Sequence, residues 1–411
     1  MTLFPLYIDP GTGSALFSIL IGAAATIYFL FRALVLKLKT GFPGSRASSS
    51  GKSYASKYVI YNEGKQYWDL FKPVVEEFEL NKIELRYLTS APDDPVFETE
   101  WIYIKPEFIG EGNKAFAYLN FLSAEVVLMT TPGLDVYQLK RSKTVKHYSH
   151  VNHGPTDVTT YRLFGLDYFD SVLLTGDYQG ADIRFLEKLR RLPEKQLVTV
   201  GCSYLDVYSQ KIKQIPSENE HVFTVLVSPS WGSSALLTRY GEKLLDPLSA
   251  SGWRVIIRPH PQSQKSENEM LERLQTRYKD SGNFVWDFER ENIYSLSKAD
   301  IMISDFSGII FDYMFLRDKP VLYVNRDFDK RIYDADDLDH ELWQFKTLKE
   351  AGIELQEDDF PQITEIIKNA GDNETLAKAR KKARETAWQC RGEAGKRTFD
   401  FMIGVANNVY K

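Results

Sequence analysis

The residues best suited to chemistry lie in three polar turns of the second half of the chain, each directly after a short apolar run. Ser228-Pro229-Ser230 follows residues 223–227, Arg258-Pro259-His260 follows residues 253–257, and Asp305-Phe306-Ser307-Gly308 follows residues 301–303. Short apolar runs are typical of parallel strands buried on both faces. Open parallel sheets bind ligands where their strands end. We therefore expect the three turns to form one site.

The residue types in these turns predict an anion site. Arg258 could bind phosphate oxygens through two N–H groups, and His260 could donate to a bridging or leaving oxygen. Ser307 adds a hydroxyl, and Gly308 lets an anion approach the amino end of the following helix. A structural explanation exists for each turn taken alone, with Arg258 in an ion pair and Ser230 as a helix cap.

A fourth turn, Asn152-His153-Gly154-Pro155, lies in the first half and follows a predicted short strand. It would place His153 at a sheet edge facing a cleft. Histidine is suited to general base catalysis near neutral pH, so the rate is expected to rise as one group loses its proton there. A zinc site is an alternative, but no Cys or helical His-x-x-x-His supports it. His147 and His150 are interpreted as structural.

Strands and helices alternate in both halves, which indicates parallel sheets covered by helices. The predicted fold class is α/β, with two facing Rossmann-like domains of the GT-B type. The domains are expected at residues 57–210 and 221–411, joined by a polar linker at residues 211–221. One last helix, residues 372–410, is expected to pack back across the hinge.

The amino terminus differs from the rest of the chain. Residues 14–31 are almost all apolar or small, residues 33–36 extend the run, and basic residues follow it but do not precede it. This pattern predicts a transmembrane or membrane-anchoring segment (residues 1–40) and a flexible linker (residues 41–56). The body would then lie on the cytoplasmic face of the cytoplasmic (inner) membrane. An anchor lying in the membrane plane is the alternative.

Composition and missing motifs exclude several classes. The net charge of −5 argues against nucleic acid as a partner, and two cysteines do not suggest a disulfide framework. Neither a G-x-x-x-x-G-K-[ST] loop nor a G-x-G-x-x-G turn occurs, which disfavours an ATPase or a dehydrogenase. We expect no cofactor and no tightly bound metal.

The turns together resemble those of the CDP-glycerol glycerophosphotransferases, which build teichoic-acid-type poly(glycerol phosphate) chains at the cytoplasmic membrane. The family's signature Asp-Tyr-Ser-Ser…Phe-Asp…Arg/Lys-Pro is similar to Asp305–Gly308 with Phe311-Asp312 and Lys319-Pro320. Its other elements are similar to Arg258–Pro261, His153-Gly154, Ser228–Trp231 and, more loosely, Gly64–Tyr67. The sequence departs from the family's pattern at four places: Asn152 replaces Trp, Gly232 replaces Arg, Gly308 replaces Ser, and Pro155-Thr156 reverses Thr-Pro.

The resemblance implies a membrane-associated transferase that moves glycerol phosphate, or another polyol phosphate, from a CDP-activated donor. The acceptor would be a hydroxyl of a lipid-linked compound or a glycan, and CMP would leave. The implied catalytic residues are His153, as the base, and His260. The implied donor-binding residues are Ser230, Arg258, His260, Asp305, Ser307, Gly308 and Asp312, and those on the acceptor side are Gly64, Lys65, Gln66 and Gly154.

Two other functions remain open. One is a GT-B glycosyltransferase or nucleotide-sugar epimerase, which would act at a sugar carbon. The other is a catalytically inactive, membrane-tethered module that binds nucleotide-activated polyols.

Overall fold

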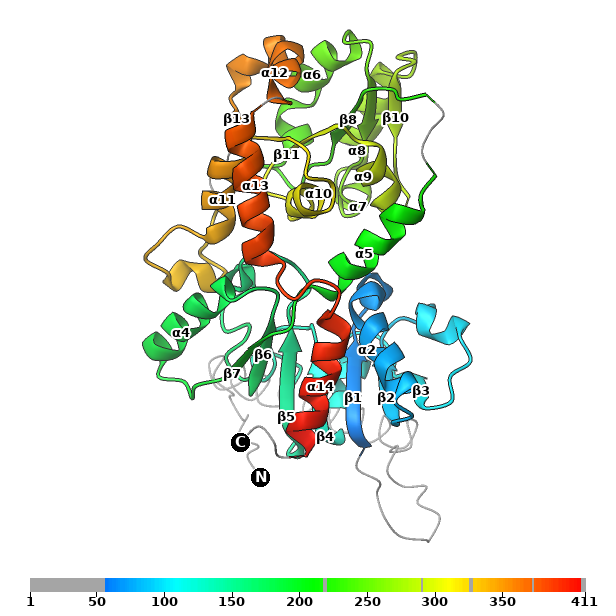
Figure 1. The fold of residues 1–411 in the computed structure, drawn as a ribbon, viewed down its shortest axis with the longest axis vertical. Helices are drawn as coiled ribbons and strands as arrows, with labels where there is room; N and C mark the ends of the chain where they lie inside the picture. Colours follow the sequence, from blue (N-terminus) through cyan, green and yellow to red (C-terminus); the bar gives the residue numbers. More distant parts are fainter. Residues whose placement is uncertain (1–55, 217–219, 290, 325–327, 372, 408–411) are drawn as a thin grey trace, which may run out of the picture. The chain divides into compact units, whose positions relative to one another are not determined.

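The computed structural model describes residues 56–216, 220–289, 291–324, 328–371 and 373–407, and residues from 55 onward form one compact unit. This unit contains two parallel sheets (Figure 1). The predicted membrane segment and nearly all of the predicted linker that follows it lie outside the described residues. Within the described ranges, no helix combines the length and apolar character needed to cross a bilayer.

The first sheet has seven strands in the order β3-β2-β1-β4-β5-β6-β7. Val126 and Leu128 of β4 pack in one apolar core, whereas Val127 and Met129 pack in another. This sheet is therefore buried on both faces, which explains its continuous apolar runs. The strands are β1 (Ser56–Asn62), β2 (Leu85–Thr89), β3 (Ile104–Phe108), β4 (Ser123–Met129), β5 (Thr144–Val151), β6 (Ser171–Leu174) and β7 (Gln196–Thr199).

The helices of this half follow the predicted alternation. In α2, the residues Phe71, Val74, Val75 and Phe78 are buried against the sheet at helical spacing, as predicted. Helix α5 extends to Gln214, so the first part of the predicted linker is helical. The helices are η1 (Lys65–Tyr67), α2 (Trp68–Leu80), η2 (Pro95–Glu98), α3 (Asn113–Leu119), η3 (Val158–Thr160), α4 (Tyr178–Arg190) and α5 (Ser203–Gln214).

The second sheet has six strands in the order β10-β9-β8-β11-β12-β13. Strand β8 pairs in parallel with β9 on one side and β11 on the other. The three polar turns therefore leave neighbouring strands at the same edge, as predicted. The strands are β8 (Thr224–Val227), β9 (Arg254–Ile257), β10 (Phe284–Trp286), β11 (Ile301–Ser304), β12 (Val321–Val324) and β13 (Ile353–Leu355).

Helices cover both faces of the second sheet, and their apolar residues fill one core on each face. Helix α10 begins directly after the turn that contains Ser307 and Gly308. The helices are α6 (Leu236–Ser249), α7 (Ser263–Ser266), α8 (Asn268–Arg277), α9 (Ile293–Lys298), α10 (Ile309–Arg317), η4 (Asp334–Asp337), α11 (Trp343–Ala351), η5 (Glu357–Gln362) and α12 (Ile363–Ala370).

The prediction of a single last helix is wrong, because the chain breaks it into α13 (Glu374–Ala387) and α14 (Ala394–Ala406). Gly392 has a φ of +82°, which a helix cannot accommodate. The carboxylate of Asp206 accepts bonds from Trp388 Nε1 (2.9 Å), Gly392 N (2.8 Å) and Ala394 N (3.2 Å), and so holds the break in place.

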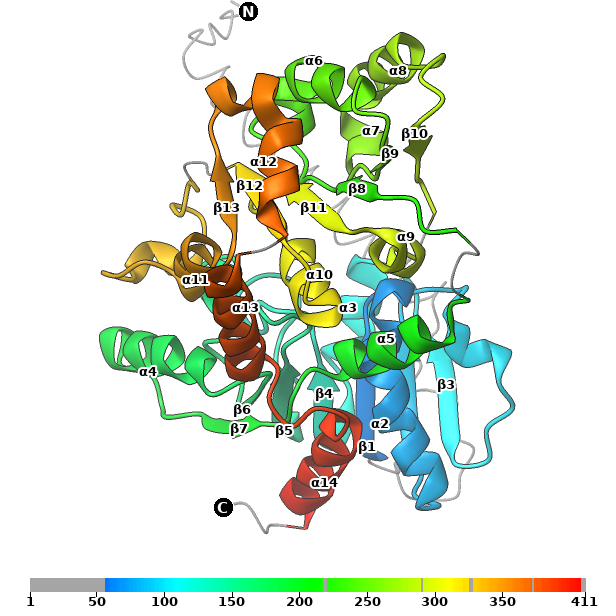
Figure 2. The same ribbon diagram turned by 45° about the horizontal axis from the view of Figure 1, so that its top comes forward.

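The chain does pack back across the hinge, as predicted. Helix α14 lies beside α2 and the first sheet, with the rings of Phe399 and Phe78 4.9 Å apart (Figure 1). Helix α5 lies between α2 and α10 (Figure 2), so it contacts elements of both halves.

The segment between β12 and α11, together with the first residues of α11, also contacts the first half. Asp334 N donates to the carbonyl oxygen of Tyr161 (2.9 Å), and the carboxylate of Asp157 accepts from Trp343 N (3.1 Å) and Gln344 N (2.8 Å). These bonds fix residues 157–161, close in sequence to His153, against the second half.

Candidate active site

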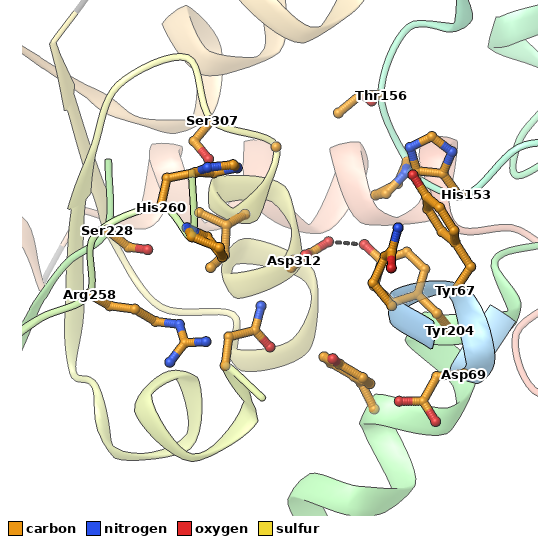
Figure 3. Close-up of a pocket in the computed structure, with 18 of the residues that line it drawn as sticks. Tyr67, Asp69, His153, Thr156, Tyr204, Ser228, Arg258, His260, Ser307 and Asp312 are labelled. Atoms are coloured by element: carbon orange, nitrogen blue, oxygen red, sulfur yellow. Dashed lines mark hydrogen bonds between the residues drawn. The ribbon is translucent and has the colours of Figure 1, made fainter. Parts of the chain in front are cut away.

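A cleft of about 420 Å³ lies where the strands of both sheets end. Residues of the first half and of α5 form one wall, and residues of the second half form the other (Figure 3). The cleft contains His153 on the first wall and the polar turns on the second, so the structure brings together residues that are more than 100 positions apart. Its lining includes Gln66, Tyr67, Asp69, His153, Gly154, Thr156, Tyr204, Tyr208, Ser228, Arg258, His260, Asn292, Ser307, Gly308 and Asp312.

The amino end of α10 forms the part of the second wall best suited to an anion. Ser307 and Gly308 both line the cleft there. The first N–H groups of a helix lack partners within the helix, and its dipole favours negative charge. Gly308 leaves the approach open, since a Cβ added to it would meet no atom closer than 4.0 Å.

Two predicted donor-binding residues, Ser230 and Asp305, do not line the cleft. The buried carboxylate of Asp305 accepts from Ser230 N (2.9 Å), Ser230 Oγ (2.9 Å), Leu236 N (3.0 Å) and Ser307 N (3.2 Å). It therefore joins the turn after β8 to the turn after β11. Ser228 lines the cleft from the same turn instead of Ser230.

His260 lines the cleft as a neutral hydrogen-bond donor. Gln262 N donates to its Nδ1 over 3.1 Å, so Nε2 holds the proton of the neutral ring. Burial lowers the pKa of His260, although Asp305 and Glu267 act in the opposite direction. Nε2–H is thus available to donate to an oxygen of a ligand.

Arg258 lines the cleft, but much of its guanidinium group is already engaged. It donates to the Asp287 carboxylate (2.6 Å) and to the carbonyl oxygen of Glu289 (2.6 Å). These bonds hold the loop after β10, which carries Asn292 into the cleft. Removing the Arg258 side chain would therefore disturb that loop as well as any contact with an anion.

Asp312 lies one turn into α10, and its Oδ1 accepts from the hydroxyl of Tyr204 on α5 (Figure 3). Burial raises the pKa of Asp312 to about 7, while the Tyr204 bond acts to lower it. A neutral carboxyl group does not repel an anion, whereas a carboxylate does.

This titration gives a testable expectation. If an anionic nucleotide binds in the cleft, its affinity should fall as the pH rises through 7, because Asp312 then becomes negatively charged. Asp312→Asn should keep the affinity more nearly constant between pH 6 and pH 8. Calorimetric titration of CDP at several pH values measures this, and an identical pH dependence in both proteins would contradict it.

His153 lies on the opposite wall with its Nδ1 turned away from the cleft. Nδ1 is 3.1 Å from both Thr130 Oγ1 and the Tyr161 hydroxyl, and the Tyr67 ring is 5.2 Å from the imidazole. Burial lowers the pKa of His153 to about 4, so the ring is neutral at pH 7. The sequence alone predicted a rise in rate near neutral pH. With the lowered pKa of His153, the rise is expected near pH 4 instead.

Of the four residues predicted on the acceptor side, Gln66 and Gly154 line the cleft, whereas Gly64 and Lys65 do not. Lys65 forms an ion pair with Asp93 instead. The sequence analysis missed Tyr204 and Tyr208. Their spacing of four residues would have placed both on one helix face, but no turn or glycine marked them as part of a site.

Across the residues described, no three or more His, Cys, Asp or Glu side chains cluster in a way that could hold a metal ion. The sequence contains Asp-x-Asp motifs at residues 327–329, 334–336 and 337–339. Asp334 and Asp337 each pair with Arg190 at 2.7 Å, and Asp329 pairs with Arg331 at 2.6 Å.

Two α/β halves with a shared cleft at their strand ends define a GT-B-like protein. Residues 224–357 match the model of the family described as CDP-Glycerol:Poly(glycerophosphate) glycerophosphotransferase. The resemblance to this family is therefore shown, and it covers the residues from β8 to beyond α10, including His260 and Ser307. No curated protein matches the chain in sequence.

Solved structures share the fold at low identity. The wall teichoic acid polymerase TagF has 13% identity, a TM-score of 0.56 and coverage of 86% of this chain and 90% of its own. A UDP-GlcNAc 2-epimerase from Neisseria meningitidis, bound to UDP-GlcNAc, has 14% identity, a TM-score of 0.56 and coverage of 84% and 99%. The S. aureus MnaA-UDP co-structure has 12% identity, a TM-score of 0.56 and coverage of 86% and 97%.

Proposed function

We propose that this protein transfers glycerol phosphate, or a related polyol phosphate, from a CDP-activated donor to an acceptor hydroxyl and releases CMP, and that the reaction takes place in the cleft. The proposal rests on one observation: the neutral histidine His153 lines one wall of the cleft, and the residues suited to an anion line the opposite wall. The anion site lies within the stretch that matches the glycerophosphotransferase family.

In the proposed reaction, the donor diphosphate binds at the amino end of α10, with Ser307 and His260 Nε2–H as donors to its oxygens. The acceptor hydroxyl binds near His153, which takes its proton as the oxygen attacks the β-phosphorus. One P–O bond forms, and the bond from the β-phosphorus to the bridging oxygen breaks. CMP leaves with that oxygen, and the positioned donors stabilise its negative charge.

Titration with CDP-glycerol tests the proposal directly. We expect saturable binding, and CMP release that depends on an added polyol phosphate or glycan acceptor. UDP-GlcNAc serves as the competing donor. A UDP-GlcNAc 2-epimerase has a similar fold, so a function with a sugar nucleotide is the alternative to be tested. Turnover of UDP-GlcNAc without turnover of CDP-glycerol would favour that function, and binding without CMP release would favour the inactive module.

Replacement of Ser307 by Ala isolates one contact of the donor site. The variant should bind CDP-glycerol more weakly by about 1.5–3 kcal/mol, the usual contribution of a hydrogen bond to a charged group. Calorimetry measures the difference. Ser297 on α9 is half-buried, like Ser307, and does not line the cleft, so Ser297→Ala provides the matched control. Equal affinities of wild type and Ser307→Ala would place the phosphates elsewhere.

We also propose that the apolar amino-terminal run anchors the protein to the cytoplasmic membrane, where a lipid-linked acceptor would be available. Removal of residues 1–52 should leave a folded, soluble body, because the compact unit begins at residue 55. The truncated protein should keep its affinity for CDP-glycerol and lose sedimentation with membranes. An unfolded truncated protein, or one that still sediments with membranes, would contradict the anchor.

A further inference from the structure

Four polar side chains form a cluster behind His153, away from the cleft, with Thr130, His150 and Asn152 buried and Tyr161 partly buried. The hydroxyl of Tyr161 lies 3.1 Å from His153 Nδ1, 3.2 Å from His150 Nε2 and 3.3 Å from Asn152 Oδ1. Thr130 Oγ1 is also 3.1 Å from His153 Nδ1. The Tyr161 hydroxyl has a single proton to donate, so the direction of that proton decides whether Tyr161 donates to His153 Nδ1 or accepts from it.

Asn152 determines where the Tyr161 proton points. Its Oδ1 can only accept a hydrogen bond, so the contact between the two residues requires Tyr161 to be the donor. The lone pairs of the Tyr161 oxygen are then left to accept from the two imidazole rings.

The state of His150 agrees with this direction. Its Nδ1 is buried and has no hydrogen-bond partner among the residues described. Since Tyr161 donates to Asn152, the 3.2 Å contact between the Tyr161 oxygen and His150 Nε2 is a hydrogen bond only if Nε2 carries the proton of the neutral ring. His150 Nε2–H therefore donates to Tyr161, which accepts.

The same direction gives His153 a proton on Nδ1. Since Tyr161 has already donated to Asn152, it can only accept from His153 Nδ1–H. The lone pair of the neutral ring then lies on Nε2, on the opposite side of the imidazole from Tyr161, and the ring lines the cleft. A histidine that removes a proton through Nε2 needs this tautomer.

Both halves of the protein hold Tyr161 in position. Its carbonyl oxygen accepts from Asp334 N (2.9 Å), and its ring lies 5.3 Å from that of His150. Because Asp334 belongs to the segment between β12 and α11, the position of the Tyr161 hydroxyl depends on the docking of that segment.

We propose that Asn152 and Tyr161 are positioning residues that hold His153 in its Nδ1–H tautomer and so keep Nε2 available as the base. The inference rests on the proposed role of His153.

NMR of the full chain labelled with ¹⁵N-histidine tests the tautomer without any substrate. Comparison with His153→Gln identifies the His153 signals. At pH 7 we expect a protonated Nδ1 and an unprotonated Nε2 in the wild type, and a shift toward the Nε2–H form in Tyr161→Phe and in Asn152→Leu. An Nε2–H tautomer in the wild type, or no change in Tyr161→Phe, would overturn the proposal.

Kinetics give the second readout. Tyr161→Phe should lower kcat at least about tenfold, since the wrong tautomer cannot accept the proton, and should leave the KM for CDP-glycerol nearly unchanged. Tyr168→Phe is the matched control, because Tyr168 is exposed and does not line the cleft, and its tautomer and kcat should stay close to those of the wild type. Thr130→Val is a comparison variant that removes the other hydroxyl at Nδ1 and keeps Tyr161. A tautomer that changes in Thr130→Val and not in Tyr161→Phe would assign the role to Thr130 and overturn the proposal.

The two readouts separate this inference from the proposed function. If CDP-glycerol proves not to be a substrate, the NMR experiment still confirms or overturns the tautomer. If CMP release is observed and the tautomer is Nε2–H, the proposed function stands and the positioning role fails.

Discussion

Replacement of His153 by Ala is expected to lower turnover by about a hundredfold or more, the usual contribution of a positioned general base. Donor affinity should change little, because Ser307, His260 and the amino end of α10 lie on the other wall of the cleft (Figure 3). Steady-state CMP release gives kcat, and calorimetric titration of CDP-glycerol gives the affinity. Normal turnover, or a loss of affinity as large as the loss of rate, would exclude His153 as the base.

The control for His153→Ala should be a histidine outside the network. His150 is unsuitable, because it is fully buried and bonds to the Tyr161 hydroxyl that also contacts His153. His221 has a side chain that is 72% exposed. His221→Ala should therefore keep full activity.

The pH dependence of the wild type follows from the lowered pKa of His153. A base works only when unprotonated, so kcat should rise as the pH passes about 4 and then stay level across neutrality. Histidine in water would place that rise near pH 6.5. A rise in kcat centred near pH 6.5 would indicate a solvated base, in conflict with the burial of this ring.

The sequence predicted correctly that the three polar turns of the second half lie together, because the signals for these turns are local. Each of the three turns directly follows an apolar strand, and β8 pairs with both β9 and β11, so the strand ends are neighbours. His153 was predicted at a strand end for the same reason, because it closely follows β5 in the sequence. The sequence also indicated the return of the last helix, but not its division around Cys390 and Gly392.

The sequence could not show how much each polar side chain is occupied by other protein groups. Asp305 looked like a ligand-binding residue, yet four hydrogen bonds within the protein occupy its carboxylate. Arg258 likewise bonds to residues more than 25 positions further along the chain. The sequence also could not predict the low pKa of His153, because this pKa depends on burial by groups that are distant in sequence.

Arg190 is expected to have a large effect on stability, although it lies outside the cleft. It lies on α4 and is only 9% exposed, and its guanidinium group is 2.7 Å from each of Asp167, Asp334 and Asp337. Two of these carboxylates are also buried, with exposures of 8% for Asp167 and 3% for Asp334. The network joins α4 of the first half to the segment between β12 and α11.

Arg190→Ala should lower the free energy of unfolding by about 3–5 kcal/mol, the usual cost of leaving buried charges without their partner. Arg397 is the matched control, because its pair with Glu393 on α14 is 47% and 58% exposed. Arg397→Ala should cost at most about 1 kcal/mol, as is typical of exposed pairs. Urea denaturation measures both values, and equal effects would show that burial of the Arg190 network adds nothing.

The loss in Arg190→Ala should also depend on pH, with a definite sign. Burial already raises the pKa of Asp334, and Arg190 acts to lower it, so loss of the guanidinium group should raise this pKa further above its value in the unfolded chain. The folded variant then binds more protons than the unfolded chain below that pKa, so its stability rises as the pH falls. The difference in unfolding free energy from the wild type should therefore shrink between pH 7 and pH 5. A difference that stays constant would mean that the lost contacts, and not the unpaired carboxylates, cause the destabilisation.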